Sequence, residues 1–398
     1  MKVSINSFFR LFFILSILLV HFDPTRLRLT IVVLFVPAFI ATYLRFSFKS
    51  YLPVALAGLS IVFPFYNFLV FRDFDYSYGE FVKTYVLYVV AALIYICIIY
   101  MPLDQRRFDY GKSVITALYL IIFVCSLQFF GYLLLNTTIF YNPFEPFQYN
   151  NQAIVETLVA NALPRAQGLY LEPSYLGLVI ITLTCMSLLY NKNVKLTLIL
   201  GAAAIFLSGS RGGIFGFFLI LLWYFYFNMG AAKMWGKVFY FILFISIIPV
   251  FVLFTPILSL LSAESLATEN TSQYARFYSG FQLSYYVLKD HYLGLPLGSI
   301  EQSFSFFMNE LNTSYSFFFF NIFYHGWASF LILLFIAISI IVQKVKLKLK
   351  ILLVIYVLLY FNMTGSVIAP DTYFWFVCFY YAYKIGSQKS PELSTINP

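Results

Sequence analysis

Long apolar runs, separated by short polar segments, follow one another along the whole chain. A helix that crosses a bilayer needs about 20 mostly apolar residues, because each residue advances the helix by only about 1.5 Å. The pattern therefore predicts an all-α, polytopic integral membrane protein with twelve spanning helices. These are expected at residues 6–22, 28–45, 51–71, 82–102, 114–135, 173–190, 195–209, 212–229, 238–261, 314–342, 349–366 and 370–385.

Composition agrees with this class. Hydrophobic residues make up 62% of the 398 positions and charged residues only 10%, whereas a soluble domain carries about 25% charged residues. The four cysteines all fall inside apolar spans, which indicates small core residues rather than a disulfide framework or a metal site. They are Cys97, Cys125, Cys185 and Cys378.

The distribution of charge predicts how the spans are oriented. With both termini in the cytoplasm, the cytoplasmic segments hold 17 of the 25 Lys and Arg residues but only 3 of the 16 Asp and Glu residues. Cytoplasmic loops are enriched in Lys and Arg, so this orientation is the expected one. The net charge of +9 is then a signal of topology, and no nucleic-acid partner is needed to account for it.

Two loops, both predicted on the outer face, are longer than the rest. They cover residues 136–172 and 262–313, and loops beyond about 15 residues are usually functional or disordered. Apolar residues at three- and four-residue spacing predict a helix over 274–288 on the membrane surface, followed by a turn at Gly294–Gly298. No internal repeat or separate soluble domain stands out, so residues 1–398 are expected to form a single membrane domain.

The first group of candidate residues stands where the first outer loop ends. Arg165 is followed by Gly168, which lets the backbone turn, and then by Glu172-Pro173-Ser174. Proline suits the first turn of a helix, and the positive end of that helix favours an ionised Glu172. Two interpretations fit: a plain helix start, or a charged site in which Arg165 and Glu172 act together. Ionised groups at the edge of membrane helices are costly and usually functional.

A second group interrupts two apolar spans at the same predicted face. Residues 208–213 read Ser-Gly-Ser-Arg-Gly-Gly. Glycines let a ligand approach the backbone, and the N–H groups that open the next helix suit an anion, with Ser208, Ser210 and Gly212 beside them. Arg211 adds a fork of donors that matches phosphate oxygens. The alternative is a tight helical hairpin whose arginine extends to the membrane interface.

Other polar residues are weaker candidates. Arg276 stands in the second outer loop and could be a plain solvated arginine, and Asp290 with His291 could supply a base or simply form a polar loop. His325, within a predicted span, is expected to pack against a neighbouring helix through a hydrogen bond. Asp371 begins the last span, either as an N-terminal charge or facing the same cavity as the arginines.

Metal and nucleotide chemistry have little support in the sequence. Asp73-Phe-Asp75 matches the Asp-x-Asp pattern of some metal-dependent sugar transferases, but two acids in a short loop arise easily by chance. No zinc-ligand cluster, phosphate-binding lysine loop, dinucleotide fingerprint or nucleophilic-serine elbow is present in the sequence.

The many spans, the two segments described above and a large outer loop with an arginine together resemble the O-antigen polymerase and ligase superfamily. Within it, the Glu172-Pro173-Ser174 run and Gly365-Ser-x-x-x-Pro370 are most similar to Wzy-type polymerases of O-antigen and other exopolysaccharides. The resemblance implies a bacterial inner-membrane glycosyltransferase whose site faces the periplasm. Such enzymes transfer a growing glycan from undecaprenyl diphosphate to the sugar of a fresh lipid-linked repeat unit.

This resemblance suggests roles for the candidate residues. Arg165, Arg211 and Arg276 are expected to neutralise the leaving diphosphate, and Glu172 to act as base for the acceptor hydroxyl or to position Arg165. The arginines would take the role of a metal cation, so no metal or cofactor is expected. The expected partners are the lipid-linked oligosaccharide, the lipid bilayer, and a chain-length regulator and flippase. The residues expected to contact substrate are Gly168, Ser174, Ser208, Ser210, Gly212, Asp290, His291 and Asp371.

Three alternatives remain at this stage. An O-antigen ligase shares the resemblance, but ligases tend to carry a histidine late in the large outer loop, whereas His291 lies earlier and His325 lies within a span. A lipid-linked oligosaccharide flippase should place charges near mid-membrane in a central cavity, and here the charges cluster at the two faces. A purely structural partner protein would not need the paired arginines.

Overall fold

The computed structural model describes residues 5–20, 52–70, 78–79, 81–86, 88–89, 110–138, 140–141, 164–170, 173–190, 193–228, 279–297, 317–342, 345–363, 375–376, 378–380, 382–383 and 386–387. Within these ranges all regular structure is helical, in agreement with the predicted class. The predicted spans 28–45 and 238–261, and most of 82–102, lie outside the described residues.

Apart from α13 and the division of one predicted span into α16 and α17, the described helices fall where long apolar runs predicted them. The helix that follows Glu172 has the predicted bounds, and it begins at Pro173, as expected for a residue that lacks a backbone N–H. The helices are α1 (Ile5–Leu18), α3 (Leu52–Val70), α5 (Tyr110–Leu135), α7 (Pro173–Tyr190), α8 (Val194–Ser208), α9 (Arg211–Asn228), α13 (Ser279–Asp290), α16 (Phe317–His325), α17 (Ala328–Val342) and α18 (Leu347–Met363).

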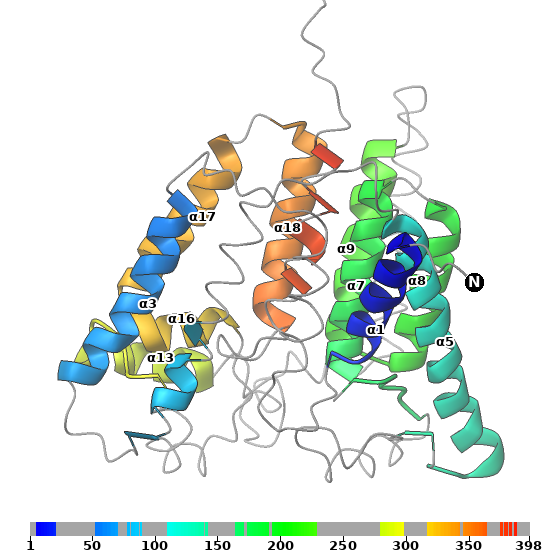
Figure 1. Ribbon diagram of the computed structural model, residues 1–398, viewed down its shortest axis with the longest axis horizontal. Coiled ribbons are helices and arrows are strands. Elements are labelled where there is room, and N and C mark those ends of the chain that lie inside the picture. Colours follow the sequence, from blue (N-terminus) through cyan, green and yellow to red (C-terminus); the bar gives the residue numbers. More distant parts are fainter. Residues whose placement is uncertain are drawn as a thin grey trace, which may run out of the picture.

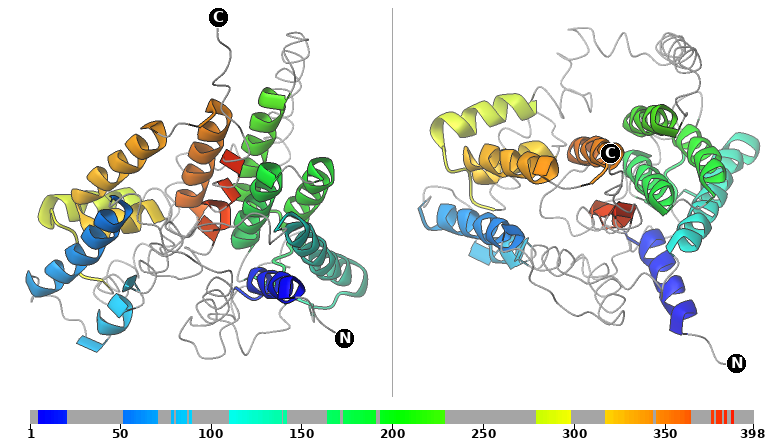
Figure 2. Two further views of the ribbon diagram at one scale, coloured as in Figure 1. Left: turned by 45° about the horizontal axis from the view of Figure 1, so that its top comes forward. Right: turned by 90° about the horizontal axis from the view of Figure 1, so that it is seen from above.

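The buried apolar side chains form two clusters. The larger, called here the α7 cluster, is built from α1, α5, α7, α8, α9 and α18 together with described residues between 375 and 383. The smaller, called the α16 cluster, combines α13 and α16 with residues 81–88 and the turn 295–297. Figures 1 and 2 show α1, α5, α7, α8 and α9 on one side, α3, α13, α16 and α17 on the other, and α18 between them.

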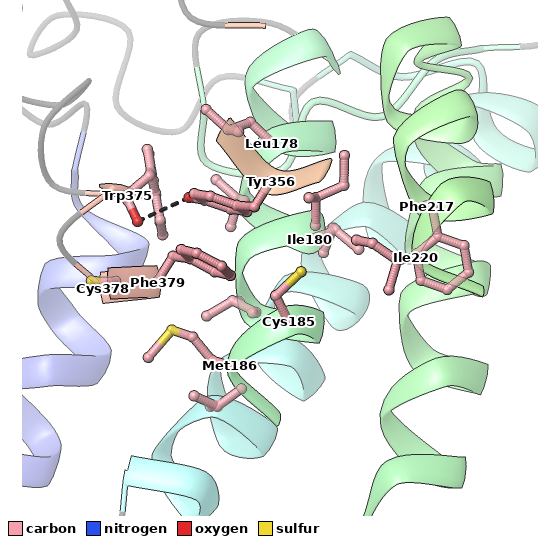
Figure 3. Close-up of a cluster of buried hydrophobic side chains, with 14 of the residues drawn as sticks. Leu178, Ile180, Cys185, Met186, Phe217, Ile220, Tyr356, Trp375, Cys378 and Phe379 are labelled. Carbon is pink, nitrogen blue, oxygen red and sulfur yellow. Dashed lines mark hydrogen bonds between the residues drawn. The ribbon is translucent and has the colours of Figure 1, made fainter. Parts of the chain in front are cut away.

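Helix α7 is the centre of the larger cluster. Apolar residues surround it on all sides, which is typical of a fully buried helix, and 83% of its residues are buried, against 33% for the most apolar part of α5. Its Thr182 hydroxyl bonds the hydroxyl of Tyr356 at 2.9 Å. Tyr356 in turn donates to the backbone oxygen of Trp375 at 3.0 Å and stacks on Phe379 (Figure 3). Polar links of this kind join helices inside an apolar medium.

Two described helices are long and apolar enough to cross a membrane by length and composition, namely Gly111–Leu135 and Pro173–Tyr190. Shorter apolar helices cover Ile61–Val70, Val194–Ser208 and Gly212–Phe227, and a further one covers Ala328–Val342. The predicted total of twelve spans remains a prediction.

Helix ends that the charge pattern places on the same side of the membrane lie in contact with one another in the structure. At the predicted outer end, the backbone N–H of Ala166 donates to Leu207 O at 2.9 Å. At the predicted inner end, the indole of Trp223 donates to Lys348 O at 2.7 Å, and the Lys348 ammonium lies 5.3 Å from the centre of that ring. The α7 cluster therefore has a glycine- and serine-rich end and a lysine-bearing end.

The predicted single span 314–342 is wrong in its described part. The chain instead forms α16 and α17, separated at Gly326, whose φ is +52°. The break is fixed by the turn after α13, because Trp327 N donates to Tyr292 O at 2.9 Å and Leu295 N donates to Phe323 O at 2.6 Å. A Cβ on Gly326 would collide with Tyr292 O, so only glycine fits.

The predicted outer-loop helix is confirmed over its described part as α13. It buries Leu283 and Val287 in the α16 cluster and leaves Phe281 and Tyr285 exposed. Glycine then turns the chain at Gly294 (φ +90°), inside the predicted turn. Contact of α13 with the membrane surface remains a prediction.

Candidate functional site

The turn between α8 and α9 is shaped by its own small residues. Helix α8 ends at Ser208, and Gly209 takes a left-handed conformation (φ 53°) while its N–H donates to Phe206 O at 3.1 Å. The Ser208 hydroxyl donates to Ile205 O at 2.8 Å and accepts from Ser210 N at 3.1 Å. The turn is therefore held by local hydrogen bonds in a buried setting, which explains the Ser-Gly-Ser order.

Ser210 is the N-cap of α9. Its hydroxyl oxygen accepts a hydrogen bond from Gly213 N at 3.1 Å, and Ile214 N donates to Ser210 O at 2.8 Å. A serine that accepts from the third helical N–H is the preferred start of a helix. The positive end of α9 thus begins at Arg211, immediately after the glycine turn.

Arg165 lies directly on this turn. Its Nε donates to Ser208 O at 3.4 Å, and a Cβ added to Gly209 would lie 3.3 Å from Arg165 Cγ. The side chain is half-buried. Arg165 and the 208–213 segment, which the sequence places at the same predicted face, are therefore in contact although they are separated by about forty residues. This places a permanently charged guanidinium beside the positive end of α9.

The far end of α18 closes the other side of the turn. A Cβ on Gly212 would meet Met363 Cε at 3.6 Å, and one on Gly177 of α7 would meet the same atom at 3.2 Å. Ser174 lies one turn earlier in α7 and is half-buried. The glycine turn is thus bounded by the starts of α7 and α9 and the ends of α8 and α18.

The segment that carries Arg165 is held by a residue that the sequence analysis did not select. Gln128 of α5 is fully buried, and its side-chain oxygen accepts from Gly168 N at 2.8 Å while its amide nitrogen donates to Gly168 O at 2.7 Å. Gly168 has φ +66°, in agreement with the predicted turn. The signal available in the sequence was that Gln128 is the one amide side chain in the span 114–135.

Several predicted site residues cannot be placed. Glu172, Arg276 and Asp371 lie outside the described residues, as do Asp73 and Asp75. Arg211 is described for its backbone, as the first residue of α9. Their roles remain predictions.

Asp290 and His291 lie close in the chain to Val287, which is buried in the α16 cluster. Asp290 is the last residue of α13, which packs on α16, and His291 directly follows it. Figures 1 and 2 show α13 on the opposite side of α18 from α7 and α9. The His291 ring makes an edge contact with Tyr286 at 5.6 Å. Burial lowers the pKa of His291, while the nearby Asp290 carboxylate acts in the opposite direction. The described residues do not bring this pair to Arg165.

His325 forms the hydrogen bond that was expected of it. Its Nδ1 donates to Asn321 O at 3.0 Å, so Nε2 is the acceptor for the hydroxyl of Tyr88 at 3.4 Å. The cysteines Cys125, Cys185 and Cys378 are free and buried, and their burial agrees with the prediction of small core residues. Among the described residues, no group of three or more His, Cys, Asp and Glu side chains is arranged to hold a metal ion.

A half-buried arginine on a glycine turn, beside a helix N-terminus, is suited to an anionic ligand. Comparison with known families gives the class a name. The chain matches the WcaD colanic acid polymerase family over residues 8–385, and it belongs to that family. A search of curated proteins found no match. Family membership confirms the resemblance to Wzy-type polymerases and supports a repeat-unit polymerase of exopolysaccharide synthesis, an enzyme of the glycosyltransferase type.

Proposed function

We propose that this protein lengthens an exopolysaccharide by transferring a growing glycan from undecaprenyl diphosphate to a lipid-linked repeat unit. The acceptor hydroxyl oxygen forms a bond to the anomeric carbon of the glycan, and the bond from that carbon to the diphosphate breaks. The hydroxyl proton passes to a base, and the diphosphate leaves on its lipid. Family membership supports the polymerase class. The donor and acceptor are part of the proposal.

The position of Arg165 is the observation that carries the proposal. A leaving diphosphate gains negative charge as its bond to the sugar breaks, so a site must supply fixed positive charge there. Arg165 lies on the backbone of Ser208 and Gly209, immediately before the N-terminus of α9. A guanidinium and the first N–H groups of a helix act on an anion in the same direction.

The remaining roles extend this arrangement. Arg211 and Arg276 join Arg165 in neutralising the diphosphate, and Glu172 takes the proton of the acceptor or positions Arg165. Since arginines supply the positive charge, the transfer is expected to be insensitive to chelators. Residues 1–398 act as one membrane domain, and a chain-length regulator and a flippase work with it.

The proposed topology gives the site its compartment. Twelve spans with cytoplasmic termini, in the bacterial inner membrane, put the 208–213 turn and the loops 136–172 and 262–313 in the periplasm. The separation of the glycine- and serine-rich end from the lysine-bearing end supports this orientation, because cytoplasmic ends are enriched in Lys and Arg.

The test is the glycan profile of cells that carry Arg165→Ala or Arg211→Ala, at matched protein level. The expected result is loss of long polymer, with single repeat units accumulating. The control is Lys346→Ala, which removes an exposed cation at the predicted inner end and should leave the polymer unchanged. Full-length polymer retained on its lipid would indicate a ligase, repeat units retained on the cytoplasmic side would indicate a flippase, and a normal profile would contradict the assigned roles.

A further inference from the structure

Gln128 is an amide side chain inside a mostly apolar helix, and every hydrogen-bonding position of that amide is used. Its oxygen accepts from Gln167 N at 3.1 Å and from Gly168 N at 2.8 Å. Its nitrogen donates to Gly168 O at 2.7 Å and to Phe140 O at 3.0 Å. A primary amide has two donor hydrogens and two acceptor lone pairs, so Gln128 is fully satisfied by backbone groups.

These bonds fasten two separate segments to α5. The segment 140–141 follows α5 in the chain, and the segment 164–170 precedes α7. A second glutamine joins the same two segments, because Gln167 donates from its amide nitrogen to Tyr141 O at 2.6 Å. Gln167 is itself buried. The two glutamines therefore hold the backbone around Gly168 through bonds that do not involve the 208–213 turn.

The opposite side of the same segment is bonded to α8. Three consecutive backbone N–H groups of this segment donate hydrogen bonds. Ala166 N donates to Leu207 O at 2.9 Å, and Gln167 N and Gly168 N donate to the side-chain oxygen of Gln128. Arg165 directly precedes these three residues, and its Nε reaches Ser208 O. The position of the Arg165 side chain along the turn is thus set by a backbone that Gln128 holds.

We propose that Gln128 is a positioning residue for glycan transfer, which fixes where Arg165 meets the leaving diphosphate. The proposal rests on the proposed function, in which Arg165 neutralises that group. Electrostatic stabilisation depends on donors that are already in place when charge develops. A displacement of about 1 Å can lower a rate by about 100-fold. Because Gln128 is fully buried and its amide is occupied by backbone groups, it acts through Arg165.

A matched control exists in the other cluster. Asn67 of α3 is fully buried, and it too uses its amide to hold a glycine turn, donating to Leu293 O at 2.8 Å and to Tyr324 O at 3.2 Å. It therefore matches Gln128 in burial and in donating both amide hydrogens to backbone oxygens, although the Asn67 Oδ1 accepts no hydrogen bond. Its bonds go to the α16 cluster and away from the segment of Arg165. Loss of either amide leaves buried backbone groups without partners.

The experiment compares Gln128→Met and Asn67→Leu, each alone and combined with Arg165→Lys, by the amount of polymer per unit of membrane-inserted protein. Met keeps the approximate length of Gln, and Leu keeps the branched shape of Asn, while both remove the hydrogen-bonding groups. We expect Gln128→Met to lower polymer roughly tenfold when Arg165 is intact and less than about twofold when combined with Arg165→Lys. Asn67→Leu should change polymer by the same factor in both backgrounds.

The outcomes separate this proposal from the proposed function. If Gln128→Met lowers polymer by the same factor with Arg165 intact and with Arg165→Lys, the positioning role is overturned. Normal polymer in Gln128→Met cells, when Arg165→Ala cells make none, would overturn it too. Normal polymer in Arg165→Ala cells would overturn the role of Arg165 and the proposal with it. If Gln128→Met fails to accumulate, the same comparison is made with Gln128→Glu and its control Asn67→Asp, each with and without Arg165→Lys. These substitutions keep the side-chain volume and an acceptor oxygen and remove the amide donor.

Discussion

Gly177 of α7 and Gly213 of α9 bring two helix backbones into direct contact at the start of both helices. A Cβ on Gly177 would lie 2.9 Å from Gly213 Cα and 2.8 Å from the hydroxyl oxygen of Ser210. Small residues allow membrane helices to approach this closely. The contact sets the position of the Ser210 cap relative to α7, and so the position of the whole glycine turn.

Replacing Gly177 by alanine should therefore force these helices apart. Overpacking of this kind costs about 1–3 kcal/mol, and the obstructing atoms include backbone that cannot rotate away. We expect Gly177→Ala to lower the thermal unfolding midpoint of the detergent-solubilised protein and to lower polymer. The control is Gly58→Ala in α3, where nothing lies within 4 Å of the added methyl group. Equal midpoints for the two variants would contradict the close packing of α7 and α9.

The sequence predicted those features that depend on near neighbours. The start of α7 at Pro173 and the turn after Ser208 follow from proline and glycine chemistry within a few residues. The break at Gly326 was missed, because apolar and aromatic residues continue through it and its cause is a backbone contact with Tyr292. Long-range partners decide such positions, and a single sequence does not reveal them.

The same limit applies within the candidate site. Ser208, Ser210 and Arg165 could be selected because charged and small polar residues stand out among apolar ones. Gln128 was overlooked although it stands out equally, because nothing in its own span shows that its partner is Gly168, about forty residues away. An isolated amide in a mostly apolar helix thus indicates a side chain that hydrogen-bonds a distant backbone segment, and only the fold identifies that segment.

The predicted orientation can be measured by labelling. Thr138 follows α5 at the predicted periplasmic end, and Lys346 precedes α18 at the predicted cytoplasmic end; both are exposed. In a background without the native cysteines, a membrane-impermeant maleimide should label Thr138→Cys in intact cells whose outer membrane is permeable. It should label Lys346→Cys only after the inner membrane is opened. The reverse pattern would invert the topology and place the 208–213 turn in the cytoplasm.

The bond between Tyr88 and His325 should contribute to stability without affecting transfer. Tyr88→Phe removes the hydroxyl that donates a hydrogen bond to His325 Nε2. Tyr88 is buried in the α16 cluster. Loss of a hydrogen bond of this kind costs about 1 kcal/mol. The unfolding midpoint should fall while polymer per unit of protein stays unchanged. Tyr78→Phe, at an exposed position, serves as the control, and equal midpoints would show that the bond contributes nothing.

Ser210 offers a way to separate helix capping from anion binding. Asn and Asp replace Ser at an N-cap at nearly equal stability, because each presents an acceptor oxygen to the N–H groups of the first turn. They have the same size and differ in charge. Ser210→Asn and Ser210→Asp should therefore accumulate to similar levels and unfold at similar temperatures, with the aspartate variant favoured slightly by the positive end of α9.

Their activities should differ if a diphosphate binds at this turn. The carboxylate introduced by Ser210→Asp would repel the leaving group and pair with Arg165, so polymer should fall about tenfold or more below that of Ser210→Asn. The comparison is made by gel profile of the polysaccharide at equal protein level. Equal polymer in the two variants would mean that Ser210 only caps α9, and that the negative charge of the substrate is bound elsewhere.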